Sequence, residues 1–139
     1  MVDPSRIRGP VIGIGCDLVD IERMRDMHER HGERCLEKIF SAAEQEYCMA
    51  MRNPYPSLSA RFAAKEAVSK AFGCGIGKDF GLLSLSVEKG PQGQPIAVLD
   101  ELGLTLLRKV GGAEVLLSLT HTSTQAMAFA VIVGGTKHL

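Results

Sequence analysis

The sequence contains no tryptophan, and aromatic residues make up only 5% of its 139 residues. No apolar run approaches the roughly 18 residues of a membrane-spanning helix, and the N-terminus lacks the apolar stretch of a signal peptide. Lys and Arg total 16, as do Asp and Glu, and this zero net charge argues against a dedicated nucleic-acid-binding protein. We therefore expect a cytoplasmic protein that binds neither membranes nor nucleic acid and has an aliphatic core.

Cysteines are few, and none of them forms a Cys-x-x-Cys pair. Their wide spacing is typical of a reducing compartment rather than of a disulfide framework. His28, His31 and Cys35 lie at helical offsets and could face one way. A zinc ion would need a further ligand or an open position, and Gly32 is expected to break the helix inside this group. Exposed polar residues at a helix end are therefore the favoured interpretation.

The length fits a single domain over residues 1–139, long enough to bury roughly 70% of the surface of the unfolded chain. Periodicity predicts strands over 11–16, 83–87, 96–99, 115–120 and 126–133, the last two as a hairpin. It predicts a helix over 20–31 that Asp20 caps, helices over 60–72 and 102–110, a short amphipathic segment over 34–40, and another helix after a capping box at 41–44. Because helices come early and strands late, we expect an α+β fold with a mainly antiparallel sheet packed by helices.

Acidic and basic residues combine at two places. Asp17 follows the first predicted strand, where a helix cap or turn is the favoured interpretation from position alone. Glu66 and Lys70 share a face of the helix over 60–72, which alone predicts a surface ion pair. The functional alternative is a Mg²⁺ site held by Asp17 and Glu66, with Arg61, Lys65 and Lys70 neutralising phosphate oxygens.

The glycine-rich segment that starts at Gly73 does not match a nucleotide-binding motif. Phe72 stands at the first glycine position of a P-loop, and Asp79 replaces the required hydroxyl residue. A dinucleotide fingerprint would follow a strand, whereas this segment follows a helix. We interpret it as a helix C-cap whose backbone N–H groups could approach a phosphate.

Two further positions have a structural and a functional interpretation. His121 lies in a turn rich in Ser and Thr, which would suit either a structural histidine or a phosphate contact. Arg23, Arg30 and Arg34 would share a face if the first helix continued past Gly32. Because acidic residues alternate with these arginines, a solvated face is the favoured interpretation.

Four segments together resemble one family. They are GIGCDLVDIERM (13–24), FSAAEQEYC (40–48), RFAAKEAVSKAFGCGIG (61–77) and LSLTHTSTQAMA (117–128). In this order they are similar to the holo-[acyl-carrier-protein] synthases, the small bacterial-type 4′-phosphopantetheinyl transferases. The resemblance covers residues 11–133, so residues 1–10 are expected to be an extension without chemistry. It implies transfer of 4′-phosphopantetheine from coenzyme A to a serine of apo-acyl carrier protein, in support of fatty acid biosynthesis. Adenosine 3′,5′-bisphosphate would be released.

The resemblance also implies roles for single residues. Asp17 and Glu66 match the ligands of Mg²⁺, for which Mn²⁺ could substitute. Coenzyme A would contact the residues that match its binding groups, which are Arg61, Lys65, Lys70, Gly73, His121 and Thr122. Arg23 matches a basic position that meets the acidic carrier protein. The family implies a homotrimer with active sites between subunits.

The expected mechanism is phosphoryl transfer, in which Lys70, and also Lys65, offset the charge of the transition state. Glu66, or a metal-bound water that it orients, is the expected acceptor of the serine proton. One alternative is a metal-dependent nuclease, although such sites usually place Lys two residues after Glu on a strand. Another is a non-catalytic module that binds carrier protein or nucleotide, although Asp17, Glu66 and Lys70 are all present.

Overall fold

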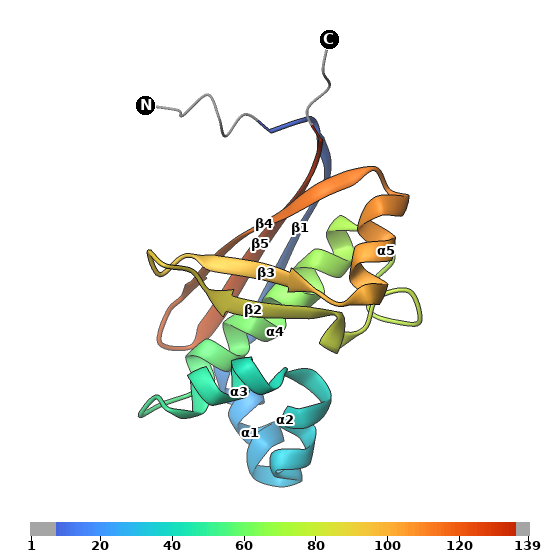
Figure 1. Cartoon of the computed structure of the whole chain (residues 1–139). Helices are drawn as coiled ribbons and strands as arrows, with labels where there is room; N and C mark the ends of the chain where they lie inside the picture. Colours follow the sequence, from blue (N-terminus) through green and yellow to red (C-terminus); the bar gives the residue numbers. More distant parts are fainter. Residues whose placement is uncertain (1–7, 136–139) are drawn as a thin grey trace.

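A long helix lies between two antiparallel sheets in the computed structural model, which describes residues 8–135 (Figure 1). In chain order the elements are β1 (Val11–Asp20), α1 (Ile21–His31), α2 (Glu33–Ile39), α3 (Ala42–Met49), α4 (Tyr55–Ala71), the 3₁₀ helix η2 (Leu82–Ser84), β2 (Leu85–Lys89), β3 (Pro95–Leu99), α5 (Glu101–Lys109), β4 (Gly112–His121) and β5 (Gln125–Gly134). The expected α+β class is confirmed. Of the expected extension 1–10, residues 1–7 lie outside the described residues.

Strands from the two ends of the chain form a sheet in the order β1-β5-β4. The hairpin of β4 and β5 has the expected place, and Thr122 N donates to the Gln125 carbonyl at its turn (2.7 Å). β1 pairs antiparallel with β5, with Asp17 opposite Ala128. Asp17 therefore lies on an edge strand, and β5 separates it from β4.

Helix α4 packs unusually close to β1 because two residues of the strand lack a side chain. A Cβ atom at Gly13 would lie 2.0 Å from the Ala71 carbonyl oxygen, and one at Gly15 would lie 1.9 Å from the Ala67 oxygen. Any other residue at these positions would push the helix away from the strand. Buried alanines extend this close packing from α4 to β5: Ala63, Ala64 and Ala67 in α4, and Ala126, Ala128 and Ala130 in β5.

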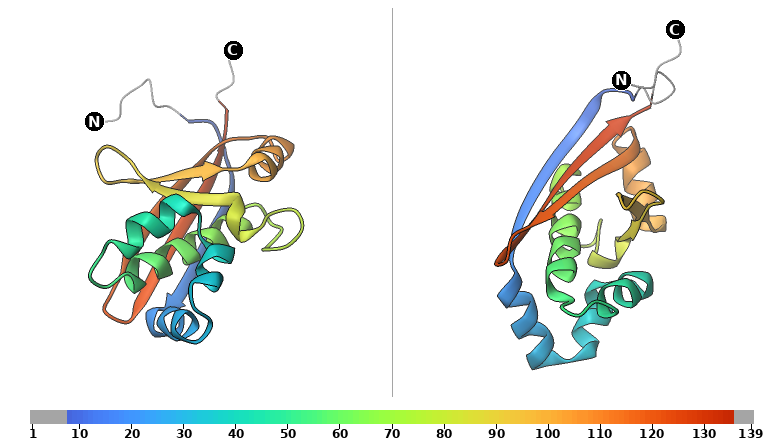
Figure 2. Two further views of the ribbon diagram at one scale, coloured as in Figure 1. Left: turned by 60° about the horizontal axis from the view of Figure 1, so that its bottom comes forward. Right: turned by 90° about the vertical axis from the view of Figure 1, so that its left-hand side faces the viewer.

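The second sheet is the hairpin of β2 and β3, which together with α5 covers the side of α4 that faces away from the first sheet (Figure 2). No ladder joins the two sheets within residues 8–135. The strands are thus antiparallel as expected, but they form two sheets rather than one. Asp100 caps α5 by accepting a hydrogen bond from Gly103 N (2.8 Å).

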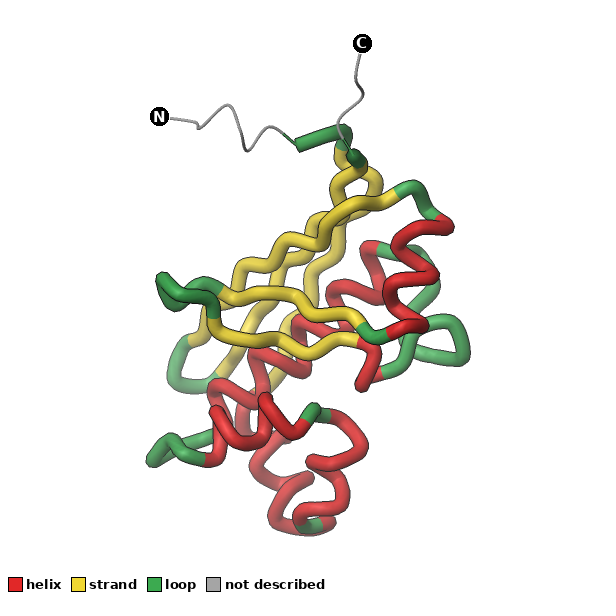
Figure 3. Tube along the Cα trace, viewed as in Figure 1, coloured by secondary structure: helices red, strands yellow, loops and turns green. Residues whose placement is uncertain are grey.

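The short helices α1, α2 and α3 gather at one end of the molecule (Figure 3). The predicted capping box is present in α3, where Ser41 Oγ accepts from Glu44 N and Glu44 Oε1 accepts from Ser41 N. Gly32 ends α1 as predicted, with a φ of 71°. Asp20, expected to cap α1, makes no side-chain cap hydrogen bond and instead accepts from Gln125 Nε2 (3.2 Å).

Two element boundaries differ from the predictions in ways that affect the site. β1 continues to Asp20 because its ladder with β5 does not stop at Cys16, so Asp17 lies inside the strand rather than after it. α4 begins at Tyr55 instead of residue 60, because Pro56 fits the first turn, where no backbone donor is needed. Within the described part of the chain, no helix has the length and apolar character to span a membrane.

Candidate active site

The two predicted metal-binding carboxylates approach each other where α4 crosses β1. Lys70 Nζ donates to Asp17 Oδ1 (2.9 Å) and to the Cys16 carbonyl (3.1 Å), which ties the end of α4 to the strand. Glu66 lies one helical turn before Lys70 on the same face of α4. The structure therefore brings Asp17, Glu66 and Lys70 together.

Burial and neighbouring charges both shift the pKa values of Glu66 and Lys70. Burial raises the pKa of Glu66, the nearby Asp17 carboxylate raises it further, and Lys70 partly offsets both effects. Lys70 is exposed, and its hydrogen bond to Asp17 is the main cause that raises its own pKa. No hydrogen bond among residues 8–135 engages the Glu66 carboxylate, so its oxygens are free to accept a proton or a cation.

The donor set fits a hard divalent cation. Mg²⁺ binds oxygen ligands and commonly takes only one or two protein carboxylates, with water and phosphate oxygens completing its shell. Two adjacent carboxylates with one lysine supply that chemistry. Among the described residues, no group of three or more His, Cys, Asp or Glu side chains offers a metal site of another kind. His28 bonds Tyr55 Oη and Glu33 Oε1, each at 2.9 Å, through its two ring nitrogens.

Arg61 and His121 lie away from these carboxylates in the folded protein. Both line a cavity of about 460 Å³ between α4, the β2–β3 turn and the tip of β4. At about 100° per residue, Lys70 lies about 180° around α4 from Arg61. Asp17 and Glu66 are not among the residues that line this cavity. One chain therefore carries the carboxylates and the Arg61 cavity on different sides of α4.

Arg61 is largely buried and well held. Its Nη1 donates to Ser57 Oγ (2.7 Å), and its guanidinium carbon lies 4.7 Å from the centroid of the Tyr47 ring. His121 is exposed at the end of β4, with Nδ1 3.2 Å from the Thr122 carbonyl oxygen. Their shared cavity offers cationic and hydrogen-bonding groups to an anion.

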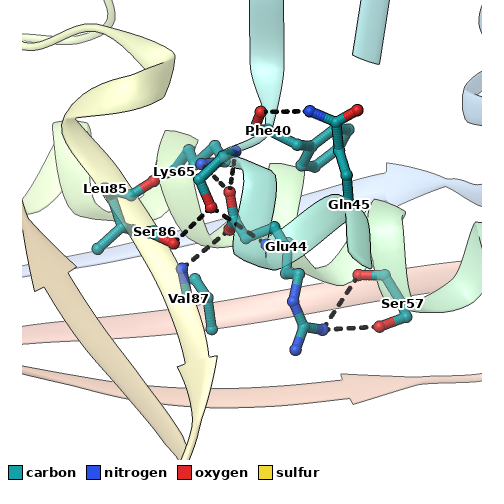
Figure 4. A network of polar contacts seen from close by, with 10 residues as sticks. Phe40, Glu44, Gln45, Ser57, Lys65, Leu85, Ser86 and Val87 are labelled. Atoms are coloured by element: carbon teal, nitrogen blue, oxygen red, sulfur yellow. Dashed lines mark hydrogen bonds and ion pairs between the residues drawn. The ribbon is translucent and has the colours of Figure 1, made fainter. Parts of the chain in front are cut away.

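Lys65 does not lie where the sequence predicted it. Its side chain is fully buried, and Nζ donates to Glu44 Oε1 (2.8 Å) and to the Leu85 carbonyl (Figure 4). Glu44 Oε2 accepts from Val87 N (2.9 Å). Burial lowers the pKa of Lys65, whereas Glu44 acts in the opposite direction. The ammonium group of Lys65 therefore joins α3, α4 and β2 inside the protein, and this placement does not test the expected contact with coenzyme A.

The remaining predicted residues lie at exposed positions. Gly73 follows α4 with a φ of 79°, and its N–H donates to the Lys70 carbonyl, as expected of a helix C-cap. Thr122 Oγ1 accepts from Gln125 N (3.0 Å) and thus stabilises the turn after β4. Arg23 lies on the exposed face of α1. None of these placements tests a contact with a ligand.

Comparison with known proteins assigns this arrangement to a family. The family model described as the 4′-phosphopantetheinyl transferase superfamily matches residues 13–130, which contain Asp17, Glu66 and Lys70. The chain belongs to this superfamily. Its relatives named holo-[acyl-carrier-protein] synthase include one from Chlamydia felis, 45% identical over 85% of this chain and 93% of the relative. Another, from Desulforudis audaxviator, is 44% identical over 89% of this chain and 94% of the relative.

Solved structures of the same kind share the fold of this transferase. The holo-[acyl-carrier-protein] synthase of Neisseria meningitidis superposes with a TM-score of 0.83 at 27% identity, over 88% of this chain and 98% of that chain. The Helicobacter pylori enzyme, solved in complex with coenzyme A, gives a TM-score of 0.76 at 29% identity, over 86% and 98%.

Sequence reasoning missed three residues that shape this transferase. Tyr47 and Lys89 line the Arg61 cavity, and Glu44 neutralises Lys65. Glu44 was assigned only to the capping box, which uses one of its carboxylate oxygens. The capping box before Tyr47 and the alternation before Lys89 indicate their elements, but no local pattern shows that a helix and a strand meet at one cavity.

Proposed function

We propose that this transferase moves 4′-phosphopantetheine from coenzyme A to a serine of apo-acyl carrier protein and releases adenosine 3′,5′-bisphosphate. The observation that carries the proposal is the meeting of Asp17, Glu66 and Lys70 in a chain of this superfamily. Relatives named for this reaction cover most of the chain, and one solved relative binds coenzyme A.

Asp17 and Glu66 would hold the metal ion that the reaction needs. When bound, Mg²⁺ or Mn²⁺ supplies a positive charge that stabilises the negative charge on the pyrophosphate of coenzyme A. Lys70 fixes one oxygen of Asp17, and the Asp17 carboxylate lies close enough to Glu66 to raise the pKa of Glu66. The support for this role is the pair of adjacent carboxylates, one of them without a hydrogen bond among residues 8–135.

The side chains have separate tasks in the proposed reaction. Lys70, exposed beside Asp17, offsets negative charge on the transferring phosphoryl group. Glu66 accepts the proton of the attacking serine hydroxyl, because Asp17 is engaged by Lys70 whereas Glu66 is not. The loop that starts at Gly73 lies at the end of α4 that carries Lys70. The N–H groups of Gly73, Cys74, Gly75 and Gly77 donate to backbone carbonyls, which leaves the other N–H groups of this loop to approach the same phosphates.

The complete site is proposed to form between subunits of a homotrimer. The carboxylates and the Arg61 cavity lie on different sides of α4 in one chain. Because one long coenzyme A molecule is proposed to contact both places, they would come from neighbouring subunits. The face of the β1-β5-β4 sheet opposite α4 is also apolar and carries no covering element within residues 8–135 (Figure 2). Its exposed side chains are Ile12, Ile14, Leu18, Met127 and Phe129. An apolar surface of this kind favours association with further copies of the chain.

The acceptor is proposed to dock on α1. Arg23, Arg30 and Arg34 are exposed on and after this helix, and an acidic carrier protein would complement their charge. In this proposal the protein acts in the cytoplasm and serves fatty acid biosynthesis, and Arg23 is the residue that contacts the carrier.

The test is intact-mass spectrometry of apo-acyl carrier protein after incubation with coenzyme A, Mg²⁺ and this protein. We expect a gain of one phosphopantetheine with the wild type and none with the Asp17→Asn variant. If the folded wild-type protein produced no mass gain on the carrier protein, the proposed transferase activity would be refuted. Plasmid DNA incubated with Mg²⁺ and the protein tests the nuclease alternative, and no observation on the site favours cutting.

A further inference from the structure

Helix α1 is tied to the first residue of α4 by a polar contact that the proposed reaction does not use. His28 Nδ1 lies 2.9 Å from Tyr55 Oη, and Nε2 of the same ring lies 2.9 Å from Glu33 Oε1. The Arg25 guanidinium carbon lies 5.1 Å from the centroid of the Tyr55 ring. Two residues of α1 therefore hold the start of the helix that carries the proposed catalytic groups, and α2 contributes Glu33.

The chemistry of the two partners of His28 assigns a direction to each hydrogen bond. An ionised carboxylate such as that of Glu33 can only accept, so His28 Nε2 carries the proton. In the neutral imidazole Nδ1 is then the acceptor, and the Tyr55 hydroxyl donates to it. The side chain of His28 is only 14% exposed, whereas that of Glu33 is 68% exposed. Of the two bonds, the one to Tyr55 is the part-buried one and the one that reaches α4.

The rotation of α1 about its own axis decides where its exposed arginines point. Ile21 and Met24 bury one side of the helix, but apolar contacts have no preferred direction. A hydrogen bond, by contrast, requires both a distance and an angle. At about 100° per residue, Arg23 and Arg30 lie about 20° from each other and about 140–160° from His28 around the helix. A bond that fixes His28 therefore fixes the direction of the two arginines on the opposite side.

We propose that His28 and Tyr55 are positioning residues for the acceptor, because their hydrogen bond holds α1 in the rotation at which Arg23 and Arg30 face the carrier protein. The inference rests on the proposed function for the identity of the acceptor. Without the bond, α1 samples other rotations, and the affinity for the carrier falls with the fraction of molecules in the competent one. Bound carrier restores that rotation, so the transfer rate at saturating carrier stays the same.

Two substitutions of His28 separate its two hydrogen bonds. The Asn side-chain oxygen can take the place of Nδ1 and accept from Tyr55, whereas the Gln amide takes the place of Nε2 and donates to Glu33. In titration calorimetry with apo-acyl carrier protein, His28→Gln should bind about fivefold more weakly than the wild type, the worth of one neutral hydrogen bond. His28→Asn should bind nearly as the wild type does. Helix propensity predicts the opposite order, because Gln is the better helix former.

A variant of Tyr55 tests the other side of the same bond. Tyr55→Phe keeps the ring beside Arg25 and removes only the hydroxyl, so it should weaken carrier binding about as much as His28→Gln. The double variant should be no weaker than either single variant, because the same bond is lost in all three. In steady-state assays, each should raise KM for the carrier and leave kcat and KM for coenzyme A unchanged. A loss of folded protein would lower kcat instead.

Hydrogen exchange gives a readout that needs neither carrier nor catalysis. The amides of α1 should exchange faster in Tyr55→Phe than in the wild type, while those at the centre of α4 keep their rates. Unchanged exchange in α1 would show that the hydroxyl does not hold this helix and would overturn the proposal.

Equal carrier affinities of the Asn and Gln variants of His28 would also overturn the positioning role. The same holds for a double variant that loses the sum of the single losses, and for a lowered kcat at an unchanged KM for the carrier. A wild type that neither transfers phosphopantetheine nor binds carrier, yet shows the change of exchange in α1 with Tyr55→Phe, would refute the proposed function and support the link between His28 and Tyr55.

Discussion

Asp17 and Glu66 are adjacent carboxylates on different elements, and their cooperation can be measured. If both hold one metal ion, Asp17→Asn and Glu66→Gln should each lower the transfer rate by orders of magnitude while leaving the fold intact. The double variant should be little worse than either single variant, because either loss already empties the site. The check is kcat/KM for all three variants with far-ultraviolet circular dichroism. A double variant whose loss in log rate equals the sum of the single losses would show that the two residues act separately.

The buried pair of Lys65 and Glu44 makes a prediction about stability rather than chemistry. Lys65→Met leaves a buried carboxylate without its cation and should lower the free energy of unfolding by about 3–5 kcal/mol. Glu44→Gln leaves the ammonium group without a counter-charge and should also be destabilising. The double variant should cost less than the sum by about 1–3 kcal/mol, since no charge stays unpaired.

Urea unfolding of the three variants measures these differences. Lys109→Met is the control at an exposed lysine and should stay within about 0.5 kcal/mol of the wild type. Strictly additive costs for Lys65 and Glu44 would contradict the account of Lys65 as a structural cation, and a Lys65→Met protein of normal stability would do the same.

At the scale of elements, the contact between β1 and α4 sets the distance between the carboxylates. Asp17 lies two residues after Gly15, and Glu66 immediately precedes Ala67, whose carbonyl oxygen Gly15 faces. Gly15→Ala would place a Cβ 1.9 Å from that oxygen, so the strand and the helix must separate. We expect a loss of stability and a fall in transfer rate of about 100-fold, because a displacement of about 1 Å can cost that much.

Gly81→Ala is the matched control for this substitution. A Cβ at Gly81 would meet only Ser84 Oγ at 3.8 Å, an ordinary van der Waals distance, and should change neither stability nor rate. Thermal unfolding and the carrier-protein assay measure both properties. A Gly15→Ala protein with the rate of the wild type would show that the close approach does not position the site.

The elements also show how far a sequence can predict this molecule. The capping box at Ser41, the end of α1 at Gly32 and the β4–β5 hairpin were all predicted, because each depends on neighbours in the chain. The length of β1 was not, because its last residues are strand only through pairing with β5. The role of Lys65 was also hidden. Whether Lys65, which stands between Ala64 and Glu66, points to solvent or to a buried carboxylate depends on how α3 and β2 pack.

The same limit applies to the site. Glu66 and Lys70 are one turn apart, so their place on one face of α4 follows from the helix, and the family motifs add Asp17. The ion pair that Lys70 forms is with Asp17 rather than with Glu66, and helix spacing alone does not predict it. The separation of Arg61 from this group follows from the rotation of α4 and could have been derived from helical geometry. The joint binding of Arg61 and Lys89 by Tyr47 could not, because it brings together three elements that are distant in the sequence.

At the scale of the whole molecule, the decisive question is whether one chain is enough to form a complete active site. The carboxylates and the Arg61 cavity lie on different sides of α4, and the sheet exposes Leu18 at 56% and Ile14 at 62%. Both observations are explained if neighbouring subunits share each site and cover the sheet face. Light scattering of the wild type should then give three times the mass of the chain, and a monomer at working concentration would contradict the trimer.

Complementation between inactive variants tests the shared site directly. Glu66→Gln removes a carboxylate and His121→Ala removes a group of the cavity, so each variant alone should be nearly inactive. When the two are unfolded and refolded together, some interfaces pair an intact Glu66 from one subunit with an intact His121 from its neighbour. Random mixing makes about a quarter of the sites wholly wild type, since each of the two chains is the required one about half the time. Native mass spectrometry verifies that mixed trimers form. Mixed trimers with no more activity than the separate variants would show that each chain completes its own site.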